Sequence, residues 1–254
     1  MSGADAVARA KSIYAPAVWP TWLGLAALRL AAFLPYRGLL ALGRVAGRLG
    51  ERLASQRRHY VDRNLALCFP ALTAEQRLKL RHLHFESVGM GVLEFAMAWW
   101  WSDDRLLPLA EVQGREHLEA VVAAGGGLIL LSAHTTSLEI GGRVLQSLLP
   151  IHAMYRPNED PVLQRFIEIN RPRHVEGVIS RDNPRAMMRV LKKGGAVWYA
   201  PDQNYRGKGH VFVDFFGVPA ASNPATSRFA AVTGARVGRS TTFPRTRSPR
   251  TRGA

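Results

Sequence analysis

Residues 127–139 read GLILLSAHTTSLE, a short apolar run that ends near a histidine and leads into a helix-like pattern. A continuous apolar run of this length, preceded by glycines, is typical of a strand buried in a parallel sheet. The alternation continues along the chain, with apolar runs at 151–155, 174–180, 196–201 and 210–216 and helix-like segments at 136–149, 161–170 and 184–192. Strands that alternate with helices predict an α/β domain with a largely parallel sheet.

Polar side chains follow the first four of these runs. They are His134, Arg156, Arg181, and Asp202 with Gln203. In parallel sheets, ligands bind beyond the carboxyl ends of the strands, so we expect these side chains to share one edge of the sheet. The sequence therefore predicts a functional site there.

His134 and Glu139 stand five positions apart in H-T-T-S-L-E. Within one regular helix they would point about 140° apart, so they can meet only if His134 precedes the helix and Glu139 lies in its first turn. A carboxylate on one ring nitrogen would leave the other nitrogen free to take a proton from a hydroxyl. In the alternative reading, Thr136 and Glu139 form a capping box and His134 ends the strand by chance.

The N-terminal stretch 17–36, AVWPTWLGLAALRLAAFLPY, carries one charge, Arg29. It approaches the roughly 20 apolar residues that cross a bilayer as a helix, so we expect a retained membrane-associated segment, either spanning or shallow. Arginines continue on one helical arc at 29, 37, 44, 48 and 52, and the stretch is bracketed by Trp19, Trp22 and Tyr36. Both patterns are typical of an anionic lipid surface, and a buried helical hairpin is the alternative.

A second helix is predicted from about Thr73 to Trp101, because Thr73 and Gln76 have capping-box spacing before a helical pattern of apolar residues. It ends in three consecutive tryptophans, 99–101. Either part of this indole surface meets lipid or an acyl chain, or the indoles close the helix end against the domain.

The net charge of +15 calls for an anionic partner: nucleic acid, a membrane surface or a phosphorylated substrate. We expect no nucleic-acid partner, because no zinc-finger, RNP or phosphate-loop pattern is present. The absence of G-x-S-x-G disfavours a serine hydrolase. Cys68 is the single cysteine, which excludes an internal disulfide and a multi-cysteine zinc site, and no residue pattern requires a metal or another cofactor.

Longer motifs carry a family resemblance. They are WPTWLGL, RNLALCFP, LEFAMAWWWSDDRL, LSAHTTSLEIGGRVL, YRPNEDPVLQRFI and VWYAPDQNYRGKGHVFVDFFGVPA. Over about residues 19–237, the chain resembles the lipid A biosynthesis acyltransferases of Gram-negative bacteria, particularly the lauroyl type, within the lysophospholipid acyltransferase-like superfamily. The resemblance implies a glycerol-phosphate-acyltransferase-like mixed sheet flanked by helices. We expect a membrane-associated helical segment at 1–60 and an α/β acyltransferase domain at 61–235.

The resemblance also implies a function: transfer of a fatty acyl chain from acyl carrier protein to a Kdo-bearing lipid A precursor, at the cytoplasmic face of the inner membrane. His134, polarised by Glu139, would deprotonate the hydroxyl of a 3-hydroxyacyl chain, and amides at the start of the following helix would bind the oxyanion. Arg156, and more weakly Arg181, would bind phosphate. Asp202 and Gln203 would orient the substrate or the loop.

Residues 236–254 depart from the family pattern. They are rich in arginine, threonine, serine and proline without periodicity, which predicts a disordered or frameshifted tail and a truncated chain. The truncated end leaves open a non-catalytic membrane protein. A second alternative is an acyltransferase acting on another glycolipid such as a phosphatidylinositol mannoside, which would share the His/acid chemistry and differ in the acceptor.

Overall fold

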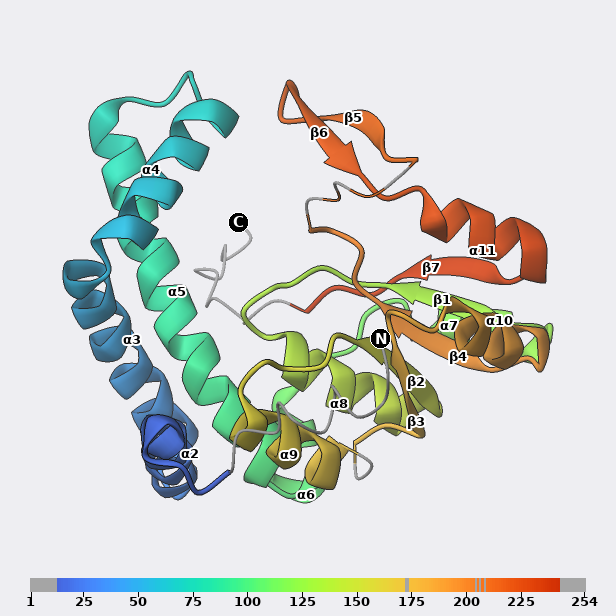
Figure 1. Ribbon diagram of the computed structural model, residues 1–254, viewed down its shortest axis with the longest axis horizontal. Helices are drawn as coiled ribbons and strands as arrows, with labels where there is room; N and C mark the ends of the chain where they lie inside the picture. Colours follow the sequence, from blue (N-terminus) through green and yellow to red (C-terminus); the bar gives the residue numbers. More distant parts are fainter. Residues whose placement is uncertain (1–12, 172–173, 204, 206, 208, 243–254) are drawn as a thin grey trace, which may run out of the picture.

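A computed structural model describes residues 13–171, 174–203, 205, 207 and 209–242. The helices, including two short 3-10 helices, are η1 (Pro16–Val18), α2 (Trp19–Ala31), α3 (Tyr36–Leu53), α4 (Ser55–Cys68), α5 (Ala74–Trp100), α6 (Asp103–Leu106), η2 (Leu107–Leu109), α7 (Arg115–Ala123), α8 (Leu138–Leu148), α9 (Pro161–Asn170), α10 (Pro184–Lys192) and α11 (Ala225–Thr233). The strands are β1 (Leu128–Leu131), β2 (Ile151–Tyr155), β3 (Gly177–Ser180), β4 (Ala196–Tyr199), β5 (Val211–Phe215), β6 (Val218–Ser222) and β7 (Arg236–Arg239). Figure 1 shows α3, α4 and α5 stacked beside an α/β unit.

The main sheet has five strands in the order β3-β2-β4-β1-β7, and every pair is parallel. This confirms the predicted α/β class and four of the predicted strands. The apolar run 210–216 is different, because β5 pairs antiparallel with β6 in a separate hairpin around Gly217. The expected mixed sheet is therefore replaced by two sheets. The five described strands of the large sheet are all parallel, and the antiparallel pair is separate.

The predicted tail begins as a strand, which corrects the boundary drawn at residue 236. Gly234 ends α11 in the left-handed conformation (φ 70°), and Arg236–Arg239 then pairs with β1 at the sheet edge. Backbone hydrogen bonds form this pairing and require no apolar side chains, so the arginine-rich sequence gave no strand signal. The rest of the tail, from residue 243, lies outside the described residues.

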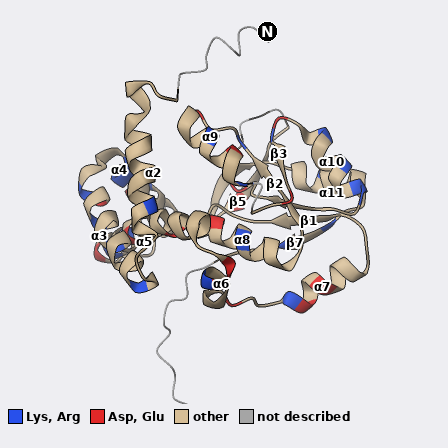
Figure 2. Cartoon of the chain, turned by 90° about the horizontal axis from the view of Figure 1, so that it is seen from below, with Lys and Arg blue, Asp and Glu red and all other residues tan. Residues whose placement is uncertain are grey.

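Both faces of the sheet are covered by helices, and Figure 2 shows the sheet between them. On one face, Ile129, Val197 and Tyr199 pack against Met187 and Leu191 of α10, with α11 beside them. The other face packs against α7 and α8, around Leu128, Leu130, Ile151, Ala153 and Ala196. Near-continuous apolar strands fit this double coverage.

The helical layer consists of α2, α3, α4 and α5, and close contact of α3 with α5 holds it together. A Cβ placed on Gly47 would lie 2.2 Å from the carbonyl oxygen of Phe85, and one on Gly89 would lie 2.1 Å from that of Gly43. The two backbones therefore approach at a distance that only glycine permits. The capping box of α5 is confirmed, because Thr73 and Gln76 exchange the two expected hydrogen bonds.

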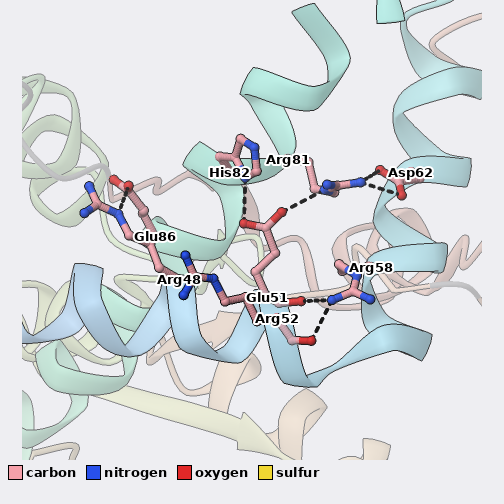
Figure 3. A network of polar contacts seen from close by, with 8 residues as sticks. All are labelled: Arg48, Glu51, Arg52, Arg58, Asp62, Arg81, His82 and Glu86. Carbon is pink, nitrogen blue, oxygen red and sulfur yellow. Dashed lines mark hydrogen bonds and ion pairs between the residues drawn. The ribbon is translucent and has the colours of Figure 1, made fainter. Parts of the chain in front are cut away.

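A polar network joins α3, α4 and α5 further along (Figure 3). Glu51 is 6% exposed, and its carboxylate accepts from Arg81 Nε at 2.8 Å and contacts His82 Nδ1 at 2.7 Å. Arg81 also donates to Asp62 on α4, while Arg58 donates to the carbonyl oxygens that end α3. Burial alone would raise the pKa of Glu51, but the contacts with His82 and Arg81 outweigh it and lower that pKa.

The N-terminal stretch 17–36 contains one complete α-helix, since α2 ends at Ala31 and α3 begins only at Tyr36, after Pro35. In the described part of the chain, no helix combines the length and hydropathy that crossing a membrane requires. Arg29 consequently belongs to α2, apart from the arginines of α3. Trp19 and Trp22 are exposed as expected, whereas Tyr36 packs against the core.

The three tryptophans close the end of α5, which confirms that alternative. Trp99 and Trp101 are buried, and Trp101 Nε1 donates to the carbonyl oxygen of Ala32 at 2.7 Å. Trp99 and Trp100 both contact the ring of Phe166 on α9. The indoles therefore pack against the rest of the chain, Trp99 and Trp100 towards α9 and Trp101 towards the end of α2.

Candidate active site

His134 and Asp202 lie together at the carboxyl edge of the sheet. β1 and β4 are neighbours, with Leu131 opposite Tyr199, and each of the two polar residues follows three positions beyond that pair. The backbone N–H of His134 donates to Asp202 Oδ2 at 2.8 Å, and Nδ1 lies 2.6 Å from Asp202 Oδ1. One carboxylate therefore fixes both the backbone and the ring of His134.

The hydrogen bonds from His134 favour the ionised form of Asp202. Partial burial would raise the pKa of Asp202, but the backbone and side-chain hydrogen bonds from His134 outweigh it and lower that pKa. An ionised Asp202 accepts, so Nδ1 of His134 carries the hydrogen of this bond, and Nε2 is the nitrogen that can act as a base. The His134 side chain is 43% exposed, so Nε2 can be reached from outside.

Glu139 lies in the first turn of α8, as predicted, but it does not supply the carboxylate at Nδ1 of His134. Its Oε1 accepts from Arg171 Nη2 at 2.9 Å, and the Arg171 side chain is 15% exposed. Burial raises the pKa of Glu139 further than the guanidinium lowers it. The expected His134–Glu139 pair is therefore replaced by two pairs, because β4 brings Asp202 to His134 while the end of α9 brings Arg171 to Glu139.

The capping-box alternative for Thr136 and Glu139 is wrong. Ser137 is the N-cap of α8, and its hydroxyl donates to Glu94 on α5 rather than to the helix. Thr136 instead has its hydroxyl oxygen 3.3 Å from that of Ser87.

Sequence reasoning missed Arg171. It follows α9 directly and lies over the Trp99 ring, 5.6 Å from the centroid. The other candidates were found because each follows a predicted strand. Arg171 follows a helix, so that criterion could not identify it. A partly buried cation beside a partly buried acid is visible only in the folded chain.

The remaining predicted residues lie along the same edge. Arg156 follows β2 and Arg181 follows β3, one and two strands beyond β4. With about 4.8 Å between strands, both are separated from the His134 pair. Arg156 pairs with exposed Glu159 at 2.8 Å, Arg181 lies 3.6 Å from Asp182, and Gln203 is exposed next to Asp202.

An apolar groove lies beside loop 132–137, the segment between β1 and α8. Its volume is about 320 Å³, and it is lined by Leu28, Val88, Gly91, Val92, Phe95 and Thr136. Thr136, two residues from His134 in the sequence, is therefore the part of this loop that lines the groove. Its walls suit an aliphatic chain, and its volume is at the lower end of the roughly 300–1,000 Å³ of ligand pockets.

Comparison with known proteins gives the family. The model of the bacterial lipid A biosynthesis acyltransferases matches residues 7–246. This chain belongs to that family. It is 39% identical over 221 residues to the lipid A biosynthesis lauroyltransferase of Escherichia coli (strain K12), an alignment that covers 87% of the chain and 72% of the relative.

Other family members are named for different acyl chains. The palmitoleoyltransferase of Escherichia coli (strain K12) is 38% identical over 80% of the chain and 66% of its own length. The myristoyltransferase of the same organism is 30% identical over 89% of the chain and 71% of its own length. The chain thus spans about two thirds to three quarters of these relatives.

Proposed function

We propose that this protein transfers a fatty acyl chain, lauroyl-like in length, from the thioester of acyl carrier protein to a hydroxyl of a 3-hydroxyacyl chain on a Kdo-bearing lipid A precursor. The observation that carries the proposal is the His134–Asp202 pair, with an apolar groove lined by Thr136 of the same loop, in a chain of the lipid A acyltransferase family. The pair fits a reaction that removes a proton from a hydroxyl, and the groove fits the acyl chain.

His134 acts as the general base. Its Nε2 takes the proton of the acceptor hydroxyl as that oxygen attacks the thioester carbonyl carbon. The tetrahedral intermediate collapses by breaking the C–S bond, and the imidazolium returns the proton to the leaving thiolate. The products are an ester and a free thiol, and no acyl-enzyme is formed. Asp202 holds the ring and stabilises the imidazolium.

Glu139 and Arg171 act at the start of α8, the helix that follows the His134 loop. Glu139 lies in the first turn of α8, so the pair holds the helix N-terminus whose amides and positive end would bind the oxyanion. Glu139 then influences the reaction through Arg171 and this turn rather than through a hydrogen bond to His134.

Arg156 is assigned to a phosphate of the acceptor, with Arg181 as a second candidate. The side chain of Arg156 is 61% exposed and that of its partner Glu159 is 87% exposed. An exposed ion pair contributes only about 0–1 kcal/mol, so a phosphate can displace Glu159 and form a bidentate pair with the guanidinium. Gln203 would orient the acceptor next to Asp202.

The helical layer is assigned to the anionic inner-membrane surface, with the site facing the cytoplasm. Exposed apolar side chains on and just after α2 and along α3 are Leu23, Leu30, Phe33, Leu42, Val45, Leu49 and Leu53. Arginines lie among them on the same helices (Figure 2). Apolar residues interleaved with cations are typical of helices lying in a membrane interface.

The proposal is tested with purified protein in detergent, by mass spectrometry of the product from acyl carrier protein loaded with chains of 10 to 16 carbons. The acceptors are the Kdo-bearing tetraacyl precursor, the same precursor without Kdo, and a phosphatidylinositol mannoside. We expect one added acyl group on the Kdo-bearing acceptor. Transfer to the mannoside alone, or no transfer by folded protein, would overturn the proposal.

A further inference from the structure

Glu94 is a buried acid that the mechanism above does not use. It lies on α5 and is 4% exposed. Its Oε2 accepts a hydrogen bond of 2.6 Å from the hydroxyl of Ser137, which is 3% exposed. Burial raises the pKa of Glu94 further than this bond lowers it. Burying a carboxyl group destabilises a fold unless its contacts compensate. Among the described residues, the bond from Ser137 is the one side-chain hydrogen bond that Glu94 forms, so the position of Ser137 matters.

Ser137 is the last residue of loop 132–137. A serine at an N-cap ordinarily accepts a hydrogen bond from its own helix. Ser137 is the N-cap of α8, yet its side chain forms no capping bond and donates to Glu94 instead. The helix start is therefore tied to α5 rather than closed on itself.

Two more contacts come from the same face of α5. Ser87, Gly91 and Glu94 are spaced four and three residues apart, which places them on one side of a helix. Ser87 contacts the Thr136 hydroxyl at 3.3 Å, and a Cβ on Gly91 would lie 2.8 Å from Cβ of Thr136. The helix thus holds two consecutive residues of the loop that carries His134.

The same helix forms the wall of the apolar groove. Val88, Val92 and Phe95 line the groove, and they alternate along α5 with the residues that hold the loop. A displacement of α5 relative to the loop would therefore change the distance between the acyl chain and His134.

We propose that Glu94 is a positioning residue for acyl transfer, which holds Ser137, and through it His134, in register with the acyl groove. The inference rests on the proposed function. It makes the helical layer part of the catalytic geometry as well as a membrane contact.

The test compares Glu94→Ala, Glu94→Gln and Ser137→Ala with two matched controls, Glu86→Ala on α5 and Ser147→Ala on α8. Glu86 pairs with Arg48 and Ser147 bonds within its own helix. Two quantities are measured: kcat and KM for transfer, and the rate at which diethyl pyrocarbonate modifies His134, followed by peptide mass spectrometry. Thermal unfolding reports whether each variant is folded.

We expect Glu94→Ala and Ser137→Ala to lower kcat by roughly tenfold to a hundredfold, since small misplacements of reacting groups have effects of this size, with KM nearly unchanged. Both should also change the modification rate of His134. Glu94→Gln should recover most of the loss, because its amide oxygen still accepts from Ser137. The controls should match the wild type.

A folded Glu94→Ala protein with wild-type kcat and wild-type His134 modification would overturn the inference. If Glu94→Ala does not fold, Ser137→Ala decides by the same criteria. Absence of transfer by the wild type would reject the proposed function instead. In that case the His134 modification rates still decide whether Glu94 positions the histidine.

Discussion

Asp202 holds His134 at two points, accepting from the backbone N–H at 2.8 Å and lying 2.6 Å from Nδ1. One contact orients the ring and the other holds the backbone, so one carboxylate fixes the loop and the ring together. Because Asp202 follows the neighbouring strand β4, His134 is positioned by the sheet rather than by the helix that follows it.

Glu139 and Arg171 are expected to act as one unit. Glu139→Ala and Arg171→Ala should each lower kcat/KM, and the double variant should lose no more than the worse single variant, because each partner depends on the contact at 2.9 Å. The three variants are compared in a double-mutant cycle. Fully additive losses would show that the residues act independently, contrary to this account.

The groove is expected to set the length of the acyl chain. Val92 lines it and is 49% exposed, so Val92→Phe should fill part of the volume and shift the preferred donor to shorter chains. Each methylene that loses its contact costs about 0.8 kcal/mol, or roughly fourfold in kcat/KM. Leu83→Phe, also on α5 but outside the groove, is the control. An unchanged chain-length profile for Val92→Phe would place the acyl chain elsewhere.

Two glycines of α3 offer a matched test of the helical packing. A Cβ at Gly47 would meet the backbone of Phe85 at 2.2 Å, whereas one at Gly50 has nothing within 4 Å. Gly47→Ala should lower the free energy of unfolding by about 1–3 kcal/mol or more, and Gly50→Ala should raise it by roughly 0.5–1 kcal/mol. Chemical denaturation measures both. Equal effects would contradict the close approach of α3 and α5.

Acid should weaken the network around Glu51. The folded state lowers the pKa of this carboxyl group below 4.5, so its contribution to stability is present above the unfolded pKa and is lost as pH falls through the folded pKa. Glu51→Gln should be less stable than the wild type at pH 7 and should lose less stability on acidification. Urea unfolding between pH 7 and 3 measures this, with Glu119→Gln on the surface of α7 as the control. Parallel pH curves for Glu51→Gln and the wild type would be inconsistent with the network.

The ends of the strands were predictable from the sequence, but the contact of His134 with Asp202 between two of those ends was not. His134 and Asp202 stand out because apolar runs precede both, and parallel topology places them at one edge. That β4 lies next to β1 depends on the tertiary packing of the whole sheet, so local spacing favoured Glu139 as the partner instead. Spacing along the chain could suggest only carboxylates near His134 in sequence. The order of the strands in the sheet decides which carboxylate contacts the His134 ring.

Other differences have equally local causes. The helix in the apolar stretch 17–36 ends at Ala31, and a new helix begins at Tyr36 after Pro35, a break that the hydropathy pattern hides. Arg236–Arg239 forms a strand through backbone bonds to β1, although its side chains suggest a loop. Arg171 follows a helix rather than a strand, and only its contact with Glu139 identifies it.

The most direct test of the central claim is single-turnover transfer of radiolabelled lauroyl from acyl carrier protein to the Kdo-bearing tetraacyl precursor. The wild type, His134→Ala, Asp202→Asn and the surface variant Asp214→Asn are compared. We predict no measurable transfer by His134→Ala and a loss of at least about a hundredfold for Asp202→Asn, whose amide would disfavour the Nδ1-protonated tautomer, with Asp214→Asn unchanged. Transfer by folded His134→Ala at the wild-type rate would contradict the account.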